Sequence, residues 1–175
     1  MDHSVGTPAP QDSVLPDLLA PGLDILFCGT AAGDASARRR AYYAGPGNAF
    51  WPTLHEVGLT PRQFEPEEYA QLMPLKIGLT DIVKRASGSD SALAKQHFDP
   101  ARVHRLIEQF HPRLLAFTSK RAAQEYLGQP VGYGLLPAMA GCTRLFVLPS
   151  PSGAARRYWS VQPWQELAHL RNERT

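Results

Sequence analysis

The chain has 175 residues, of which 43% are hydrophobic and 19% charged, so it can bury one substantial core. A formal net charge of +2 allows a nucleic-acid partner without requiring one. Residues 1–22 are rich in proline and lack the apolar core of a signal peptide, and no later apolar run is long enough to span a membrane. We therefore expect a flexible leader over 1–22, a single domain over 23–175, and a cytoplasmic protein.

Cysteine and histidine content bears on disulfides and metal sites. Cys28 and Cys142 both lie beside apolar runs typical of buried strands, which favours two separate thiols over a disulfide. Two thiols cannot complete a four-cysteine iron–sulfur or zinc site, and the six histidines show no paired metal-ligand spacing. The sequence thus predicts no metal.

Four short apolar runs, separated by helical patterns, predict an α/β fold with strands buried on both faces of a sheet. The runs are residues 23–28, 77–83, 114–117 and 145–148. The helices expected between and after them begin at Asn48, at Asp99 followed by Pro100, at Ser119 and at Pro163. Helices on both faces of a four-stranded, mainly parallel sheet make a three-layer α/β/α sandwich.

The candidate site follows from this sheet, because ligands bind beyond the carboxyl ends of parallel strands. The segments that follow the four runs carry Arg, Lys, Ser or exposed amides, which suit phosphate oxygens. They are residues 29–36, 81–85, 119–121 and 149–157. A loop of about twenty residues, as expected over 29–48, is uncommon in a compact domain unless it is functional.

Three segments resemble the mismatch-specific uracil-DNA and thymine-DNA glycosylases of the uracil-DNA glycosylase superfamily. Residues 42–51, Tyr-Tyr-Ala-Gly-Pro-Gly-Asn-Ala-Phe-Trp, are similar to the family's aromatic-Ala-x-Pro-Gly-Asn-x-Phe-Trp stretch. Residues 78–85 are similar to its Gly-Leu-Thr-Asp-Ile-Val-x-Arg segment, and residues 150–156 resemble its Asn-Pro-Ser-Gly DNA-intercalation loop. The three segments agree in order and spacing, which makes them specific together.

The resemblance implies an enzyme that flips uracil out of DNA and hydrolyses its N-glycosidic bond. The partner would be DNA containing uracil or mismatched bases, the product an abasic site, and the protein a monomer with no membrane contact. In the family's first motif, Gly-x-Asn-Pro-Gly, the Asn positions the hydrolytic water. The matching residues 29–33 have Ala31 there, and alanine cannot orient water, so another group does so or hydrolysis has been lost.

The chemistry needs a carboxylate that stabilises the oxocarbenium-like sugar and guides water. Asp81 is the first candidate, because it follows a strand at the expected active edge, and Asp34, just past the glycine turn, is the second. The alternative for Asp81 is a helix cap or a partner of Arg85, and for Asp34 a turn or cap residue.

By the same resemblance, Tyr43 stacks on the flipped base, with core packing as the alternative for this ring. The resemblance also implies that main-chain amides of the turn at Gly29, Thr30 and Ala31, and near Tyr43, read the edge of the uracil.

In the last loop, Ala154 stands where the family commonly has an intercalating Leu. Arg156 matches an intercalating Arg of the thymine-DNA glycosylases, while a solvated pair of arginines is the alternative. The DNA-contacting residues implied by the resemblance are Ser150, Ser152, Gly153, Arg156 and Arg157.

Two other functions stay open. A catalytically weak relative that binds uracil-containing or abasic DNA as a sensor or protective module would also tolerate Ala31. An unrelated α/β enzyme acting on a nucleotide or phosphorylated metabolite is compatible with the fold class alone, and it would not prefer DNA to mononucleotides.

Overall fold

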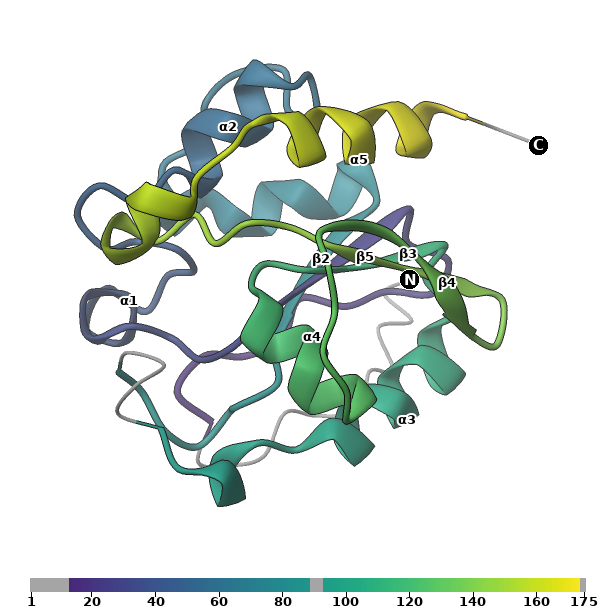
Figure 1. The fold of residues 1–175 in the computed structure, drawn as a ribbon. Helices are drawn as coiled ribbons and strands as arrows, with labels where there is room; N and C mark the ends of the chain where they lie inside the picture. Colours follow the sequence, from purple (N-terminus) through teal and green to yellow (C-terminus); the bar gives the residue numbers. More distant parts are fainter. Residues whose placement is uncertain (1–12, 89–92, 174–175) are drawn as a thin grey trace, which may run out of the picture.

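A computed structural model describes residues 13–88 and 93–173, which are built around a five-stranded sheet (Figure 1). The strand order is β2-β1-β3-β5-β4, and only the β4–β5 pair is antiparallel. The strands are β1 Ile25–Gly29, β2 Ile77–Asp81, β3 Leu114–Phe117, β4 Gly134–Ala140 and β5 Thr143–Val147. The predicted α/β class and mainly parallel sheet are confirmed, with five strands in place of four.

Strand β4 is the strand that the sequence pattern missed. It forms an edge of the sheet, all of its side chains are exposed or partly exposed, and its register with β5 shifts between Leu135 and Met139. Pro137 has no N–H for a ladder, so a strand carrying it is found only at an edge or an irregularity. A search for strands buried on both faces therefore passes over residues 134–140.

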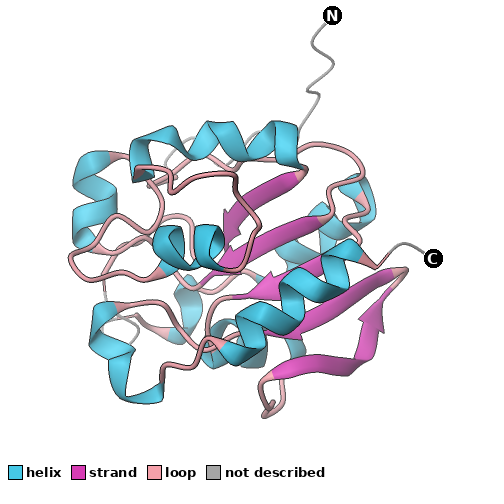
Figure 2. Ribbon diagram, turned by 90° about the horizontal axis from the view of Figure 1, so that it is seen from above, coloured by secondary structure: helices cyan, strands magenta, loops and turns pink. Residues whose placement is uncertain are grey.

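Helices cover both faces of the sheet, as expected for a three-layer sandwich (Figure 1). The α-helices are α1 Asp34–Arg39, α2 Phe50–Glu56, α3 Pro100–Phe110, α4 Lys120–Leu127 and α5 Gln162–Asn172. Strand β1 shows how the layers arise: Ile25 and Phe27 pack with α2 and α5, while Leu26 and Cys28 pack with α3 and α4. Figure 2 shows the same sheet from above, with its twisted strands between the helices.

Side-chain capping bonds confirm two of the predicted helix starts, while α5 begins at Gln162, one residue before Pro163, without such a bond. The Asp99 carboxylate accepts a hydrogen bond from the Arg102 N–H at 3.1 Å, and the Ser119 hydroxyl accepts one from the Ala122 N–H at 3.1 Å. Asn48 Oδ1 accepts a bond from the N–H of Phe50, the first residue of α2, at 2.9 Å.

The stretch expected to be one loop, residues 29–48, contains helix α1. Asp34 in its first turn and Arg38 and Arg39 in its last complement the helix dipole, a local preference that the loop prediction overlooked. The described residues also form three 3₁₀ helices, η1 Pro66–Leu75, η3 Lys95–His97 and η4 Gly153–Tyr158.

The boundary expected at residue 22 lies too late in the chain. Residues 1–12 of the expected leader are outside the described part, but Leu15 is buried and Leu18 exchanges two backbone hydrogen bonds of 2.9 Å with Leu79 of β2. Gly78 is needed beneath this segment, because a Cβ there would lie 2.5 Å from the Leu18 carbonyl oxygen. Residues 13–22 therefore belong to the folded domain.

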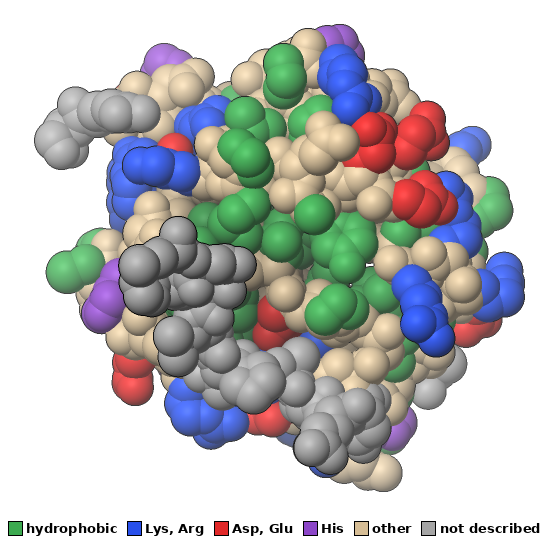
Figure 3. Space-filling model, turned by 180° about the vertical axis from the view of Figure 1, so that it is seen from behind, with side chains coloured by type: hydrophobic (Ala, Val, Ile, Leu, Met, Phe, Trp, Pro, Cys, Tyr) green, Lys and Arg blue, Asp and Glu red, His purple; other side chains and the backbone are tan. Residues whose placement is uncertain are grey.

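The face opposite to that of Figure 1 bears a central area of hydrophobic side chains (Figure 3). Where described residues form this face, Lys and Arg side chains lie around the hydrophobic area, with Asp and Glu side chains among them (Figure 3). None of the described helices is both long and apolar enough to cross a membrane.

Candidate active site

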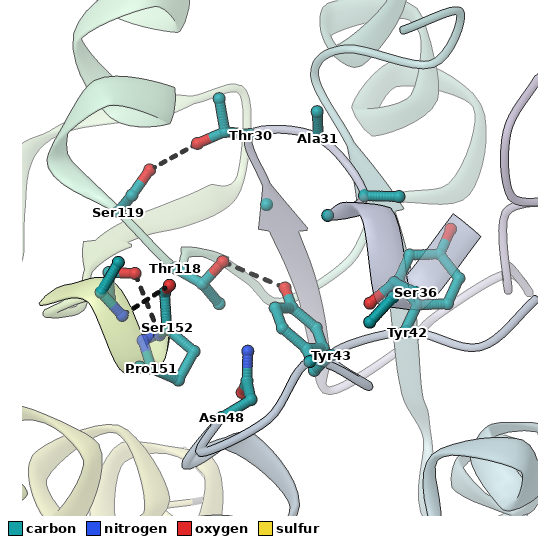
Figure 4. Close-up of a pocket in the computed structure, with 18 of the residues that line it drawn as sticks. Thr30, Ala31, Ser36, Tyr42, Tyr43, Asn48, Thr118, Ser119, Pro151 and Ser152 are labelled. Atoms are coloured by element: carbon teal, nitrogen blue, oxygen red, sulfur yellow. Dashed lines mark hydrogen bonds between the residues drawn. The ribbon is translucent and has the colours of Figure 1, made fainter. Parts of the chain in front are cut away.

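A cavity of about 590 Å³ opens where β1, β2, β3 and β5 end, within the size range of small-ligand sites. Its lining comes from the segments after these strands and from the 42–48 loop (Figure 4). The sequence placed the site at this edge, and the structure brings those segments together there. Of the four segments, the one after β3 contributes Ser119 but neither Lys120 nor Arg121.

Gly29, the last residue of β1, lies where three side chains converge. A Cβ at this position would lie 2.5 Å from Asp81 Oδ1, 3.2 Å from the Tyr43 hydroxyl and 3.4 Å from Thr118 Oγ1. Gly29 and Asp81 are also direct partners in the β1–β2 ladder. The glycine thus lets a carboxylate and two hydroxyls meet over the main chain. We call Gly29, Tyr43, Asp81 and Thr118 the pocket floor.

Asp81 is the buried carboxyl group of the pocket floor, with only 4% of its surface exposed. Burial raises its pKa above the ordinary value, and the positive charge of Lys84 partly opposes that shift. Residues 82–84 form no helix, so Asp81 does not cap one. A buried carboxyl in a cavity with a cationic neighbour is a typical acid–base or charge-stabilising group.

Asp34 lines the same cavity but in a different setting. It is exposed and occupies the first turn of α1, where a carboxylate complements the helix dipole. Its geometry therefore agrees with the alternative structural role better than with chemistry on a buried base.

Tyr43 holds its ring against the core and its hydroxyl in the pocket floor (Figure 4). The ring stacks on Phe50 with centroids 3.8 Å apart, and its hydroxyl shares a 3.0 Å hydrogen bond with Thr118. Burial raises its pKa well above the ordinary value, so the phenol is neutral at physiological pH. Its φ of 54° is unusual for a residue other than glycine, and such backbone strain clusters at functional sites.

The turn after β1 offers hydrogen-bond donors. Within residues 13–88 and 93–173, the backbone N–H groups of Thr30, Ala31 and Tyr43 form no hydrogen bond with another described residue. Thr30 itself is fixed by a 2.8 Å hydrogen bond between its hydroxyl and that of Ser119. The turn can therefore present amides to a ligand without first breaking internal bonds.

The loop after β5 packs against the 42–48 loop. The Ala49 N–H donates to the Pro151 carbonyl oxygen at 2.8 Å, and a Cβ on Gly153 would lie 2.9 Å from the Pro46 carbonyl oxygen. Within the loop, Ser150 Oγ accepts a bond from the Ser152 N–H at 3.2 Å. These contacts fix one wall of the cavity.

The two arginines of this loop are exposed and differ in their neighbours. The Arg156 guanidinium lies against Gly47, leaving no room for a side chain there, and so stands at the junction of the two loops. Arg157 instead lies over the ring of Tyr158, 5.6 Å from its centroid. Arg156 is therefore the closer of the two to the cavity wall.

Comparison with known proteins places this geometry in a family. A family model described as the uracil DNA glycosylase superfamily matches residues 16–169. The chain belongs to this superfamily. Its members are glycosylases, hydrolases that act on DNA. The match includes part of the N-terminal segment that the structure packs on β2.

A solved structure supports the assignment. The solution NMR structure of a candidate uracil DNA glycosylase from Methanosarcina acetivorans is similar to this superfamily member, with a TM-score of 0.58 and 25% sequence identity. The similarity covers 90% of this chain and 94% of that chain.

Sequence reasoning about this superfamily member missed Thr118. Its position directly after β3, beside the predicted cap Ser119, was the available signal, because the carboxyl ends of the parallel strands lie at the same edge. No three His, Cys, Asp or Glu side chains of the described ranges lie together in a way that could hold a metal ion.

Proposed function

We propose that this superfamily member is a monofunctional uracil-DNA glycosylase of the mismatch-specific uracil-DNA and thymine-DNA glycosylase group. It would act as a cytoplasmic monomer, without a cofactor, and leave an abasic site. The observation that carries the proposal is the convergence of Asp81 and Tyr43 on Gly29 at the pocket floor. Support for the group comes from the three resembling segments, 42–51, 78–85 and 150–156, which all contribute residues to one cavity.

In this proposal, the Tyr43 ring and the turn after β1 bind the base. A uracil flipped from the helix enters the cavity beside the Tyr43 ring, whose apolar surface suits a planar base. The amides of Thr30 and Ala31, which bond to no other described residue, donate to the oxygens on the uracil edge. These donors become more valuable as the base departs with negative charge.

Cleavage breaks the bond between uracil N1 and the sugar C1′, and the electron pair leaves with the base. In its ionised form the Asp81 carboxylate stabilises the positive charge that develops on the sugar. It also accepts a hydrogen bond from the water whose oxygen bonds to C1′, and the water proton passes to the carboxylate and then to solvent. Asp81 thereby does the work of the asparagine that Ala31 replaces.

The loop after β5 would contact the DNA duplex. Ser152 and Gly153 would hold a phosphate through hydroxyl and amide groups, with Ser150 supporting their backbone. Arg156 would fill the gap left by the extruded base, because Ala154 is too short to do so. Arg157, held over Tyr158, would contact the DNA backbone.

Ala31 is the observation that favours a second candidate function. Without the asparagine, a protein that binds uracil-containing or abasic DNA without cleaving it would serve as a sensor or protective module.

A single assay separates the two. Single- and double-stranded oligonucleotides with a labelled uracil are incubated with the protein and then cleaved with alkali at any abasic site. We expect cleavage at the uracil position. Tight binding to the same oligonucleotides without cleavage would establish the sensor function instead, and absence of both would contradict the proposal.

A further inference from the structure

A buried cluster of charges lies at the carboxyl end of β2 and involves the N-terminal segment. The Asp17 carboxylate forms ion pairs with Lys84, at 3.1 Å, and with Arg102. It also accepts a hydrogen bond of 2.8 Å from the Thr80 hydroxyl. The side chains of Asp17, Lys84 and Arg102 are 4%, 3% and 10% exposed, so water screens these charges little.

The same cluster reaches the carboxyl group of the pocket floor. Lys84 lies three residues after Asp81, and its positive charge acts on the Asp81 carboxyl. Arg102 Nη1 lies 3.4 Å from the Asp81 backbone oxygen and 3.3 Å from the Thr80 hydroxyl, to both of which it donates. Arg102 therefore links Asp17 to the Asp81 main chain, and Lys84 is the cation that acts on both carboxyl groups.

Among the side chains of Asp17, Asp81, Lys84 and Arg102, the charges balance when Asp81 is ionised. Asp17 and Asp81 then supply two negative charges against the two positive charges of Lys84 and Arg102. Loss of Asp17 or of Lys84 would leave the charge of the other without its partner in the interior, which is strongly unfavourable. The charge state of Asp81 is thus coupled to the pair formed by Asp17 and Lys84.

We propose that Asp17 and Lys84 are positioning residues for Asp81: Lys84 holds the carboxylate ionised, and Asp17 fixes Lys84 and moderates its effect. The inference rests on the proposed function, in which ionised Asp81 acts on the sugar. It assigns part of the active-site electrostatics to residues before the first strand.

Other ionisable groups near Asp81 do not replace Lys84. Cys28 of β1 and Tyr42 of the loop are buried and Tyr43 is partly buried, and desolvation raises the pKa of each, so they are neutral at physiological pH. Tyr69 of η1 acts on Lys84 and on Tyr42. Lys84 is thus the charged group that acts on the Asp81 carboxyl, and Arg105 acts on Arg102.

The N-terminal segment binds both the backbone and the ammonium group of Lys84. The Val14 N–H donates to the Lys84 backbone oxygen at 2.7 Å, and Asp17 binds its ammonium group. Lys84 Nζ also donates to the Tyr42 hydroxyl at 3.2 Å, and that hydroxyl donates to the Pro16 carbonyl oxygen at 2.8 Å. The ammonium group therefore has little freedom to leave the cluster.

The test measures the titration of the Asp81 carboxyl by ¹³C NMR on the full chain, with Asp81→Asn used to assign its resonance. Lys84→Met removes the cation, so we expect the Asp81 midpoint to rise by about one pH unit. Asp17→Asn removes a nearby negative charge and leaves Lys84 to Asp81 alone, so we expect the midpoint to fall. Opposite shifts are a signature that general loosening of the fold cannot produce.

Asp24→Asn is the matched control. Asp24 is also buried and pairs with two arginines, Arg113 and Arg171, but it lies at the amino end of β1. We expect it to lower the melting temperature without moving the Asp81 midpoint. If Lys84→Met does not fold, Lys84→Gln takes its place, and Asp17→Asn remains a test by itself.

An unchanged Asp81 midpoint in either variant, or shifts in the same direction, would overturn the inference. The NMR titration needs no excision activity, so it decides the coupling even if the protein cleaves no uracil. In an active enzyme, the acid limb of the pH–rate profile should move with the midpoint, changing the rate below that midpoint by about tenfold per pH unit.

Discussion

The floor and the rim of the cavity are built in different ways. Three floor residues, Gly29, Asp81 and Thr118, lie at strand ends, and the β1–β2 register sets Gly29 directly beside Asp81. We call the residues of α1 and of the loop after β5 that border the cavity its rim. The rim is held in place through backbone contacts, such as the hydrogen bond from the Ala49 N–H to the Pro151 carbonyl oxygen. The sheet therefore positions the groups proposed to act on the sugar, whereas the loops position exposed side chains that would contact DNA.

The two candidate carboxylates show the difference most clearly. Asp81, on the floor, is buried and has a raised pKa, whereas Asp34, on the rim, is exposed. A water-excluded carboxylate interacts with a developing charge far more strongly than one in solvent does. Substitution of each residue therefore tests whether excision depends on the floor carboxylate Asp81 and not on the rim carboxylate Asp34.

The largest effect is expected from Asp81→Asn. The single-turnover excision rate should fall roughly 10²-fold or more, with DNA affinity nearly unchanged, because a positioned carboxylate acts mainly in the transition state. Asp34→Asn, the matched rim variant, should excise at close to the wild-type rate. A larger loss in Asp34→Asn than in Asp81→Asn would reverse the assignment of floor and rim.

The stability of Asp81→Asn gives an independent check on burial. A carboxyl whose pKa is raised by folding stabilises the protein below its unfolded pKa, and that contribution is lost as pH rises through the folded pKa. At neutral pH, removal of the charge should therefore leave the melting temperature unchanged or raise it.

Next in size is Gly29→Ala. Its Cβ would overlap Asp81 Oδ1 and crowd Tyr43, so we expect a loss of about 1–3 kcal/mol in the free energy of unfolding together with slower excision. Gly33→Ala is the matched control, because a Cβ there meets nothing within 4 Å and Gly33 has a φ of −70°. Denaturant unfolding and excision assays on both variants check the claim, which fails if the two behave alike.

A smaller effect is expected from Tyr43→Ala. Binding of an oligonucleotide carrying a flipped base analogue should weaken by about 1–2 kcal/mol, in the lower part of the base–aromatic range, because Phe50 already covers one ring face. Tyr43→Phe keeps the ring and loses only the bond to Thr118, so it should bind within a few-fold of wild type. A large drop in melting temperature for Tyr43→Ala would mean that the ring serves the core instead.

The smallest effect on excision is expected from Arg156→Ala, in the loop after β5. Arg156→Ala should slow excision from duplex DNA by about fivefold, or about 1 kcal/mol, and leave excision from single strands nearly unchanged, since only a duplex has a vacated stack to fill.

Arg157→Ala is the comparison variant for this wedge role. As a phosphate contact, Arg157 should weaken binding to both substrates and lower the log-affinity against log-salt slope by about one unit. Equal losses on the two substrates for Arg156→Ala would remove the wedge assignment.

Sequence patterns predicted Asp81 and Tyr43 of the pocket floor but not Thr118, which bonds to Tyr43. The continuous apolar runs identified β1, β2, β3 and β5, and hence the edge at which Asp81 and Tyr43 meet. Thr118 was missed because a single threonine after a strand has no pattern, and its role exists only through the crossover that sets β3 beside β1.

The N-terminal segment shows the same limit at longer range. Its prolines suggest a leader, yet Asp17 and Leu18 pack on residues more than sixty positions away in the chain. Only Gly78, which makes room for this backbone, indicated the contact locally. Tertiary pairing of this kind cannot be inferred from periodicity, because neither partner has a regular pattern.

The most direct measurement is the pH dependence of single-turnover uracil excision by the wild-type protein. If ionised Asp81 acts on the sugar, the rate should rise with pH through one ionisation whose pKa lies above the ordinary aspartate value of about 3.9, because burial raises that pKa. This ionisation should be absent from the residual activity of Asp81→Asn. A flat profile in the wild type, or the same rise in both proteins, would contradict the assignment of the chemistry to the buried carboxylate.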